Sequence, residues 1–429
     1  MTATTRNQLD YDVTIAGGGM AGATLALALA RQSPQLRIGV VEPFAAGTGG
    51  ETPLASYQPS YDARATAMSW GTRQCYERIG VWEALAPKAT PIKRIHVSEQ
   101  QRFGSSRMDA AEHEQPALGY VVDNAWTGLN LQAALQAEAA IDWLCPARVA
   151  SVETTGECAK LTLEGSGVPL SGDKTTLTTG LLVVADGGRS PLREALGFQV
   201  EHHAYEQTAL IANVSAARPH QFEAFERFTC SGPIALLPQG DPAHSEGRCG
   251  LVWTMPPQEA EHMRSLDKTS FLAALQQAFG WRLGRFVDVG QRFCYPLVLE
   301  RVRQPLRPHV VLVGNAAHTL HPVAGQGFNL AIRGLMRLAG EVTRAFEAGK
   351  CPGDLAVLER YWAGQQEDVN GLVAASGALV SLFSGTQPSP IELGRNLGLV
   401  ALELVPPARR WFTRQAMGLG RGTSVESVQ

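Results

Sequence analysis

The chain has 429 residues, of which 45% are hydrophobic and 18% are charged, and its formal net charge at pH 7 is −3. This composition is typical of a globular protein with a substantial core, and the length suggests two or three domains. The slightly acidic balance argues against a general affinity for nucleic acid. The seven cysteines are scattered and form no C-x-x-C pair, so the sequence indicates neither a disulfide framework nor a metal site.

Neither end of the sequence predicts insertion into a membrane. The first ten residues are polar, unlike a signal peptide. The apolar runs at residues 371–383 and 397–405 are shorter than the roughly 20 residues that a membrane-spanning helix needs. We therefore expect a cytoplasmic protein whose cysteines are reduced.

A glycine-rich turn near the start of the chain follows an apolar strand at residues 12–16. An Ala/Leu-rich helix at residues 21–31 comes directly after the turn, and a second apolar strand occupies residues 37–42. This strand–turn–helix–strand order is the context that the dinucleotide-binding fingerprint requires. The residues of the fingerprint are Gly17, Gly19, Met20, Ala21, Gly22 and Glu42.

Each part of this fingerprint has a physical task. Gly17 permits the tight turn, Gly19 lets the backbone approach a pyrophosphate, and Gly22 lets the helix pack closely on the strand. The helix N-terminus presents free N–H groups to the phosphates. Glu42 can accept hydrogen bonds from both ribose hydroxyls, and its charge repels a 2′-phosphate. The glycines taken alone are also compatible with a purely structural turn.

The remaining elements predict two kinds of sheet. Before residue 200 we expect a loop, a helix, two strands, a helix and three strands, over residues 44–60, 63–79, 91–98, 119–123, 129–140, 148–153, 159–164 and 181–185. Between residues 207 and 296, alternating runs predict an antiparallel sheet with one wet face, with strands at 209–215, 224–229, 234–238 and 250–255 and a helix at 270–279. A buried strand at 310–314 and a mainly helical part after Gly325 complete the chain.

Two further motifs follow buried strands, at the strand ends where open parallel sheets bind ligands. One reads D-G-G-R-S-P-L-R from Asp186, and the other reads G-N-A-A-H-T-L-H-P from Gly314, followed by G-Q-G-F-N from Gly325. Each motif alone is also found in ordinary turns and helix entry loops. Because NAD needs only the first fingerprint, three motifs together favour a longer dinucleotide such as FAD.

The order of these motifs resembles that of the class A flavoprotein aromatic monooxygenases, over most of the chain. Within that family the chain is most similar to the hydroxylases of ubiquinone biosynthesis, in stretches that include residues 78–82, 224–229, 279–284 and 319–330. The resemblance implies an α/β fold in which a Rossmann-like FAD-binding domain of the glutathione-reductase type carries an inserted antiparallel β-sheet substrate domain and C-terminal helices. With the predicted elements, it assigns residues 1–75, 120–198 and 300–360 to FAD, 76–119 and 199–299 to substrate, and 361–429 to the helical end.

The resemblance also implies a set of tightly bound FAD contacts, residue by residue. The glycines of the fingerprint would hold the pyrophosphate, and Glu42 the adenosine ribose. Arg64 would lie near the ribityl chain, while Asp186 and Gly187 would serve both FAD and the pyridine nucleotide. The flavin ring and ribityl chain would contact Gly314, Asn315, Pro322, Gly325, Gln326, Gly327 and Asn329.

Two residues depart from the usual pattern of the family. Asn315 stands where most members have an Asp that binds the ribityl hydroxyls, although the branch acting on polyprenylated methoxyphenols shares this Asn. An amide keeps one acceptor and adds two donors, so we expect binding to survive. Asn130 stands where many members carry an arginine for the phosphates, which removes one expected FAD contact.

The reaction that the resemblance implies is hydroxylation of a polyprenylated (methoxy)phenol in ubiquinone biosynthesis. Such an oxidoreductase uses O2 and a transiently bound NADH or NADPH, and acts through a C4a-hydroperoxyflavin that must be shielded from water. His321 is a candidate general base, although both it and His318 are compatible with structural roles; His202 and His203 are interpreted as an exposed pair. Candidates for the wall of the substrate cavity, each also compatible with ordinary sheet core, are Phe225, Phe228, Leu236, Pro238 and Trp253.

The C-terminal region combines apolar runs with arginines, which include Arg395, Arg409, Arg410, Arg414 and Arg421. A basic amphipathic helix of this kind can bind the surface of the inner membrane or a protein complex of ubiquinone biosynthesis. The alternative is a helix that packs on the flavin domain. For the whole protein, the alternatives are a hydroxylase of a small soluble phenol and a non-catalytic flavin-binding scaffold of a lipid-synthesis complex.

Overall fold

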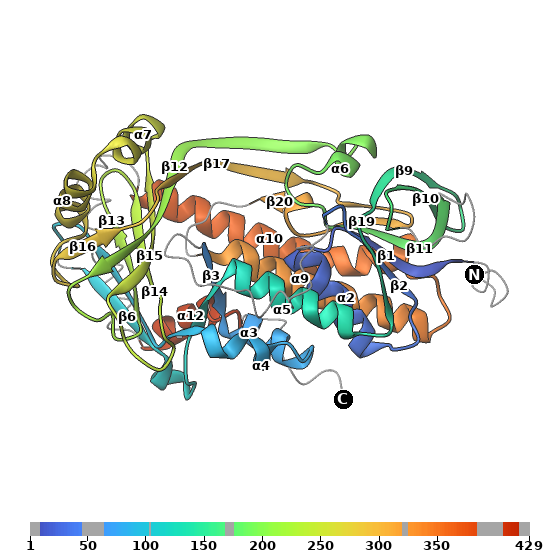
Figure 1. Ribbon diagram of the computed structural model, residues 1–429, viewed down its shortest axis with the longest axis horizontal. Coiled ribbons are helices and arrows are strands. Elements are labelled where there is room, and N and C mark those ends of the chain that lie inside the picture. The colour runs from blue at the N-terminus through green and yellow to red at the C-terminus, as the bar shows by residue number, and fades with distance from the viewer. Residues whose placement is uncertain are drawn as a thin grey trace.

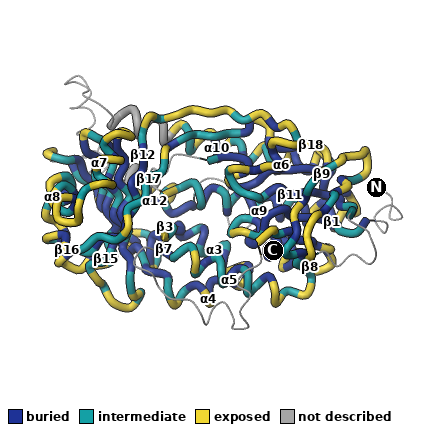
Figure 2. The backbone as a smooth tube through the Cα atoms, turned by 45° about the horizontal axis from the view of Figure 1, so that its top comes forward, coloured by how far each residue is buried: buried dark blue, intermediate teal, exposed yellow. Residues whose placement is uncertain are grey.

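The computed structural model of the chain describes residues 9–44, 64–102, 104–167, 176–319, 325–383 and 406–419. Figure 1 shows two large sheets toward opposite ends of the long axis, with helices α9 (Gln326–Glu347) and α10 (Leu355–Phe383) lying between them. The buried residues gather in both sheets and in the helices that pack on them (Figure 2). The predicted α/β fold with an antiparallel sheet and C-terminal helices is therefore confirmed.

The first large sheet, here called the parallel sheet, contains eight of the described strands. Its central strands run parallel in the order β19-β11-β1-β2-β8, with residues Val310–Leu312, Thr176–Val184, Tyr11–Ala16, Ile38–Val41 and Ile141–Leu144. Antiparallel strands extend it: β18 (Leu306–Arg307), β10 (Ala159–Glu164) and β9 (Arg148–Thr154). The buried run at residues 181–185 overlaps the last residues of β11, and the run at 310–314 begins with β19, so both predicted parallel strands are present.

Helix α2 (Met20–Gln32) covers one face of the parallel sheet. Every residue from Gly22 to Ala30 is buried, because this helix packs between the sheet, α5 (Asn124–Ala137) and α9. On the sheet side its leucines meet Val13 and Ile15 in one apolar cluster. A helix that is apolar all round is expected to lie inside a protein, which explains the Ala/Leu-rich sequence.

The second large sheet, here called the antiparallel sheet, contains nine of the described strands in the order β20-β17-β12-β15-β14-β13-β5-β6, with β16 beside β12. Adjacent strands in this sheet run antiparallel, except that β13 and β5 run parallel to each other. The strands span His318–Thr319, Phe293–Val302, Val200–Ala216, Arg248–Met255, Pro233–Pro238, Glu223–Phe228, Arg94–Glu99, Ser105–Asp109 and, for β16, Phe286–Val289. Helices α7 (Pro257–Ser265) and α8 (Lys268–Phe279) pack on one face of it.

A small sheet of strands β3 (Ala65–Ser69), β7 (Gly119–Asp123) and β4 (Thr90–Ile92) lies between the large ones. It corrects the prediction of one helix over residues 63–79, since helix α3 (Trp70–Arg78) begins only at Trp70. Pairing of β3 with β7 holds the preceding residues extended, and the Ser69 hydroxyl then accepts a hydrogen bond from the Thr72 N–H as the helix cap. Short helical segments join these strands: α4 (Trp82–Leu85), η1 (Ala86–Lys88) and η2 (Ala110–His113).

The C-terminal helix α12 (Pro406–Ala416) ends beside the start of α3 and strand β6. Met417 is fully buried in a cluster with Trp70, Met108 and Leu118, and its carbonyl oxygen accepts a 2.8 Å hydrogen bond from the Gly71 N–H. Packing of the tail on the body of the protein is therefore present at this point. Among the described residues, no helix is long and apolar enough to cross a membrane.

Candidate cofactor and substrate site

The three glycine motifs meet at the carboxyl ends of neighbouring parallel strands. Gly17 follows β1, and a Cβ built on it would lie 2.6 Å from the Ala185 carbonyl oxygen at the end of β11. Gly314 follows β19, and its Cβ would lie 3.2 Å from the Cβ of Ala21 at the start of α2. The motifs are thus in van der Waals contact with one another, at the edge where open parallel sheets bind ligands.

The first motif forms an open cradle for a phosphate. A Cβ on Gly22 would lie 1.9 Å from the Gly17 carbonyl oxygen, so only glycine fits this helix–turn contact. Around Gly19, in contrast, the described part of the chain leaves the space within 4 Å of such a Cβ empty, and it offers the N-terminus of α2 no side-chain cap. The first N–H groups of α2 are therefore available to an anion.

Glu42 is held at the end of β2 by two backbone groups. Its Oε2 accepts a 2.7 Å hydrogen bond from the Gly18 N–H, and its Oε1 accepts a 3.0 Å bond from the Phe44 N–H. A carboxylate has about four lone-pair sites, so capacity remains for ribose hydroxyls.

The second motif contains a buried oxygen atom that has no partner among the described residues. Oδ1 of Asp186 is shielded from solvent and accepts no hydrogen bond from any described residue. Burial raises the pKa of this carboxyl, opposed by a hydrogen bond from Ser190. A buried acceptor of this kind needs a donor, which a hydroxyl or amine of a ligand would supply.

Arg193 joins the second motif to the third. This buried side chain lies in helix α6 (Pro191–Ala195), which Ser190 caps by accepting a 2.9 Å bond from the Arg193 N–H. Its guanidinium donates to the carbonyl oxygens of Gly188 at 2.9 Å and Ala316 at 3.3 Å. The S-x-x-R part of the motif therefore positions two ligand-binding turns.

The third motif continues from η3 (Gly314–Ala316) to the N-terminus of α9. Gly325 is the N-cap of α9 in the left-handed conformation with φ 61°, and within the described ranges no side chain caps this helix. A Cβ on Gly327 would meet nothing within 4 Å there, so its backbone is approachable. His321 and Pro322 lie outside the described residues.

Asn329 lies in the first turns of α9 and has no spare hydrogen-bonding capacity. Its Oδ1 accepts bonds of 2.8 Å from both the Ser69 N–H and the Thr72 hydroxyl. Its Nδ2 donates bonds of 3.1 Å to the carbonyl oxygens of Ala67 and Gly325. We therefore assign this side chain to positioning of the Gly325 turn, rather than to the direct flavin contact that the resemblance implies.

The other expected FAD contacts have varied environments. Arg64 is exposed, and its Nη1 donates a 3.3 Å bond to the Tyr295 hydroxyl on β17. Asn315 is exposed at the start of the third motif, near Gly188 of the second motif. Asn130 is buried within α5 and donates a 2.8 Å bond to the Trp126 carbonyl oxygen, so its amide serves its own helix. Gln326 donates to the Ala416 carbonyl oxygen at 3.4 Å and thereby links the start of α9 to α12.

The predicted cavity wall requires a correction. Phe225, Leu236 and Trp253 are at most 4% exposed and pack with Phe271 and other side chains of α8, in the core between helices and sheet. Pro238 pairs with Cys249 of the same cluster and shares this helix face. These four residues are therefore occupied as sheet core. By strand alternation Phe228 lies on the opposite face, where it is also buried.

That opposite face, here called the open face, carries a row of half-buried residues that the sequence analysis did not single out. Strand pairing places one residue from each of six strands in register: Val97, Glu226, Ala235, Val252, Ile211 and Phe293. Alternation within each strand could have separated these residues from the core set, but it does not say which face the helices cover.

Contacts through the small sheet place the open face beside the third motif. Ala224 and Leu237 of this face pack with Ile92 of β4. Ala67, in the same cluster, would lie 3.7 Å from a Cβ on Gly325. Tyr295, bonded to Arg64, is two residues from Phe293 and shares its side of β17.

Four described histidines have environments that do not favour a role as base at the open face. His318 is buried, and burial, followed by Arg301, lowers its pKa to about 4, so it is neutral near pH 7. His202 and His203 are exposed on β12, as expected. His96 lies on the helix face beside Phe225, and burial lowers its pKa to about 4.

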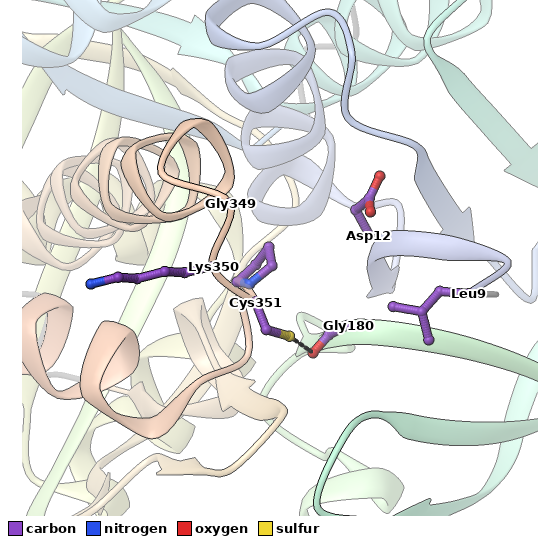
Figure 3. A pocket seen from close by; sticks show the side chains of 7 residues that line it. Leu9, Asp12, Gly180, Gly349, Lys350 and Cys351 are labelled. Atoms are coloured by element: carbon purple, nitrogen blue, oxygen red, sulfur yellow. Dashed lines mark hydrogen bonds between the residues drawn. The ribbon is translucent and has the colours of Figure 1, made fainter. Parts of the chain in front are cut away.

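A separate small pocket lies near the other end of β1 (Figure 3). Its lining includes Leu9, Asp12, Gly180 and Cys351, whose thiol donates to the Gly180 carbonyl oxygen at 3.6 Å. Asp12 is near the start of β1, whereas Gly17 follows its end. This pocket is therefore distinct from the site formed by the three motifs.

The residues at the carboxyl edge of the parallel sheet fit FAD. The uncapped starts of α2 and α9 suit a pyrophosphate and a polar ring edge, and the carboxylates of Glu42 and Asp186 suit hydroxyl groups.

Comparisons with known proteins agree with this site. The family described as FAD binding domain matches residues 10–350. Ubiquinone hydroxylase UbiL of Rhodospirillum rubrum is 35% identical, and the match covers 95% of this chain and 89% of the relative. The 3-demethoxyubiquinol 3-hydroxylase of Escherichia coli is 30% identical, and the match covers 95% of this chain and 98% of the relative. The crystal structure of p-nitrophenol 4-monooxygenase PnpA from Pseudomonas putida DLL-E4 is similar in fold, with a TM-score of 0.72, 16% identity and coverage of 95% and 98%. The chain belongs to the FAD-dependent aromatic monooxygenases, in the group that contains the hydroxylases of ubiquinone biosynthesis.

Proposed function

We propose that this enzyme hydroxylates the aromatic ring of a polyprenylated phenol in ubiquinone biosynthesis, with O2 and NADH or NADPH as co-substrates. The observation that carries the proposal is the open face, a mostly apolar wall that contacts the small sheet beside the third motif. The relatives named as ubiquinone hydroxylases support the substrate class.

The chain's own residues would hold FAD across the ends of three strands. The start of α2 would bind the pyrophosphate, Glu42 the ribose, and Asp186 a hydroxyl through its unpartnered Oδ1. The N-terminal turn of α9 would face the flavin ring, with Asn329 keeping that turn in place. When bound, FAD supplies the exchange of electrons between the reduced nicotinamide, O2 and the phenol.

In this proposal the division of the chain follows the two large sheets. Residues 1–75, 120–198 and 300–360 bind FAD, 76–119 and 199–299 bind substrate, and 361–429 form the helical end. The antiparallel sheet excludes water from the reacting ring, which protects the activated oxygen from unproductive release as peroxide.

We further propose that the protein is cytoplasmic and binds peripherally to the inner membrane, where a polyprenylated substrate resides. Arg410 and Arg414 are exposed on α12 and supply positive charge for anionic headgroups or for an acidic surface in a ubiquinone-biosynthesis complex. Adding vesicles with and without anionic lipid, and measuring co-sedimentation, tests this contact.

The central experiment measures NADH and NADPH oxidation by the purified yellow protein, with hydroxylated product and peroxide quantified together. A prenylated methoxyphenol in detergent is expected to stimulate oxidation and to give hydroxylated product. Stimulation only by small phenols would favour a hydroxylase of a soluble substrate. Bound FAD without stimulation by any phenol would favour a non-catalytic scaffold and contradict the proposal.

A further inference from the structure

We propose that Glu226 is the residue that binds the ring hydroxyl of the substrate, with its carboxylate accepting the hydrogen bond of the phenol O–H. This inference rests on the proposed phenol hydroxylation and adds a residue that directs the substrate and activates its ring. His321, the candidate base from the sequence, lies outside the described residues, and its role stays a prediction.

The position of Glu226 follows from strand geometry. On β13, Phe225 belongs to the helix face, so the next residue along the strand points to the open face. Glu226 is in register with Val97 on one side and Ala235 on the other. It is therefore a carboxyl group set in a row whose other members, across six strands, are apolar.

Nothing in the described part of the chain satisfies this carboxyl group. It has neither a hydrogen-bond donor nor an ion-pair partner there, and its side chain is half-buried. Desolvation raises its pKa to about 7. A carboxylate that is partly withdrawn from water without a partner is disfavoured, so a ligand that brings a donor would be bound preferentially.

Other ionisable groups on the open face lie in neighbouring rows. Glu99 follows Val97 by two residues on β5, Arg248 precedes Val252 by four on β15, and Tyr295 lies on β17 with Arg64 bonded to its hydroxyl. Strand β14, on the other side of Glu226, presents Ala235 and Leu237 to this face. Glu226 is thus the carboxyl group of the apolar row, in the second position from the end formed by β5.

The chemistry of a phenol matches this arrangement. A phenol O–H donates to the carboxylate, and as the proton moves to a Glu226 oxygen the O–H electron pair stays on the phenol oxygen. That shift makes the ring more electron-rich and therefore more reactive toward an electrophilic oxygen. A carboxyl group with a pKa near the working pH is suited to accept and return this proton.

The test compares Glu226→Gln with the matched control Glu223→Gln, which changes the same residue type on the same strand but on the helix-face side. Both variants are expected to retain FAD, which checks that each of them folds. Glu226→Gln should lower kcat/KM for the prenylated methoxyphenol by about a hundredfold, the size of a general acid–base contribution. In the wild type, kcat/KM should rise with pH through pH 7, and Glu226→Gln should remove this rise. Glu223→Gln should keep both the wild-type kcat/KM and its dependence on pH.

A second measurement needs no variant. The wild-type enzyme should bind the phenol more tightly than its methyl ether above pH 7, as followed by the flavin absorption spectrum, and lose this preference below pH 6. An unchanged pH profile in Glu226→Gln, or equal binding of phenol and ether in an active wild type, would refute the role of Glu226 alone. No response of the wild type to any phenol would refute the proposed function, and this inference with it.

Discussion

Replacement of Asn329 by alanine distinguishes a positioning role from a direct flavin contact. The substitution removes four hydrogen bonds, of which three join α9 to β3 and α3 and one binds the Gly325 carbonyl oxygen at the start of α9. Since Asn329 is 2% exposed, water cannot take over these partners. At about 1 kcal/mol for each bond, the free energy of unfolding should fall by about 4 kcal/mol.

The assay is urea unfolding of the protein after removal of FAD, so that the cofactor cannot contribute. The matched control is Asn370→Ala, which makes the same chemical change at an exposed position of α10 and should leave stability nearly unchanged. The reasoning would be refuted if Asn329→Ala left the stability of the FAD-free protein intact and only weakened FAD binding. That result would restore Asn329 as a flavin ligand.

Three further predictions concern the fold and its cofactor. Gly22→Ala places a Cβ 1.9 Å from the Gly17 carbonyl oxygen. Because this clash distorts the turn that would bind the cofactor, the purified variant should lack the yellow colour of FAD, and a normal ratio of flavin to protein absorbance would contradict this. Burial, and then Arg282, lowers the pKa of His96 from 6.5 to about 4. As the pH falls from 6.5 to about 4, His96 therefore takes up a proton in the unfolded chain but not in the native chain. Stability should therefore decrease by about 3 kcal/mol over this window, and His96→Leu should flatten that decrease in a pH series of urea midpoints. Met417→Ala should lower the free energy of unfolding by about 3 kcal/mol through the cavity it leaves, and an unchanged midpoint would show that the tail does not stabilise the body.

The parallel sheet and its three motifs could be predicted because their signals are local. A tight turn, an uncapped helix start and a buried apolar strand each occupy a few consecutive residues, as in the segment that ends at Gly22. The same holds for the alternating strands of the antiparallel sheet. The strand β3 was wrongly predicted as helix because its conformation depends on β7, which lies fifty residues further along the chain.

The face of a sheet that meets a ligand could not be read from the sequence. Alternation separates Phe225 from Glu226, but only the placement of α7 and α8 shows that the phenylalanine side is covered. Large aromatic residues therefore suggested a cavity wall where the protein has its core. For Asn329, similarly, the motif predicts a position near the flavin, while its three distant partners, Ser69, Thr72 and Ala67, are visible only once α9 meets β3 and α3.

The order in which the motifs occur along the chain has a consequence for biosynthesis. Gly17 leaves the ribosome early, but its neighbour Ala185 is added only 168 residues later, and Gly314, the neighbour of Ala21, is added in the last third of the chain. Translation would therefore expose β1 without its neighbour β11 until residues 176–184 have been made, a state that favours aggregation or chaperone binding. Because the last motif ends in the first turns of α9, a fragment that stops within the antiparallel sheet has no complete binding edge. Only chains that include α9 would then be expected to retain the yellow cofactor.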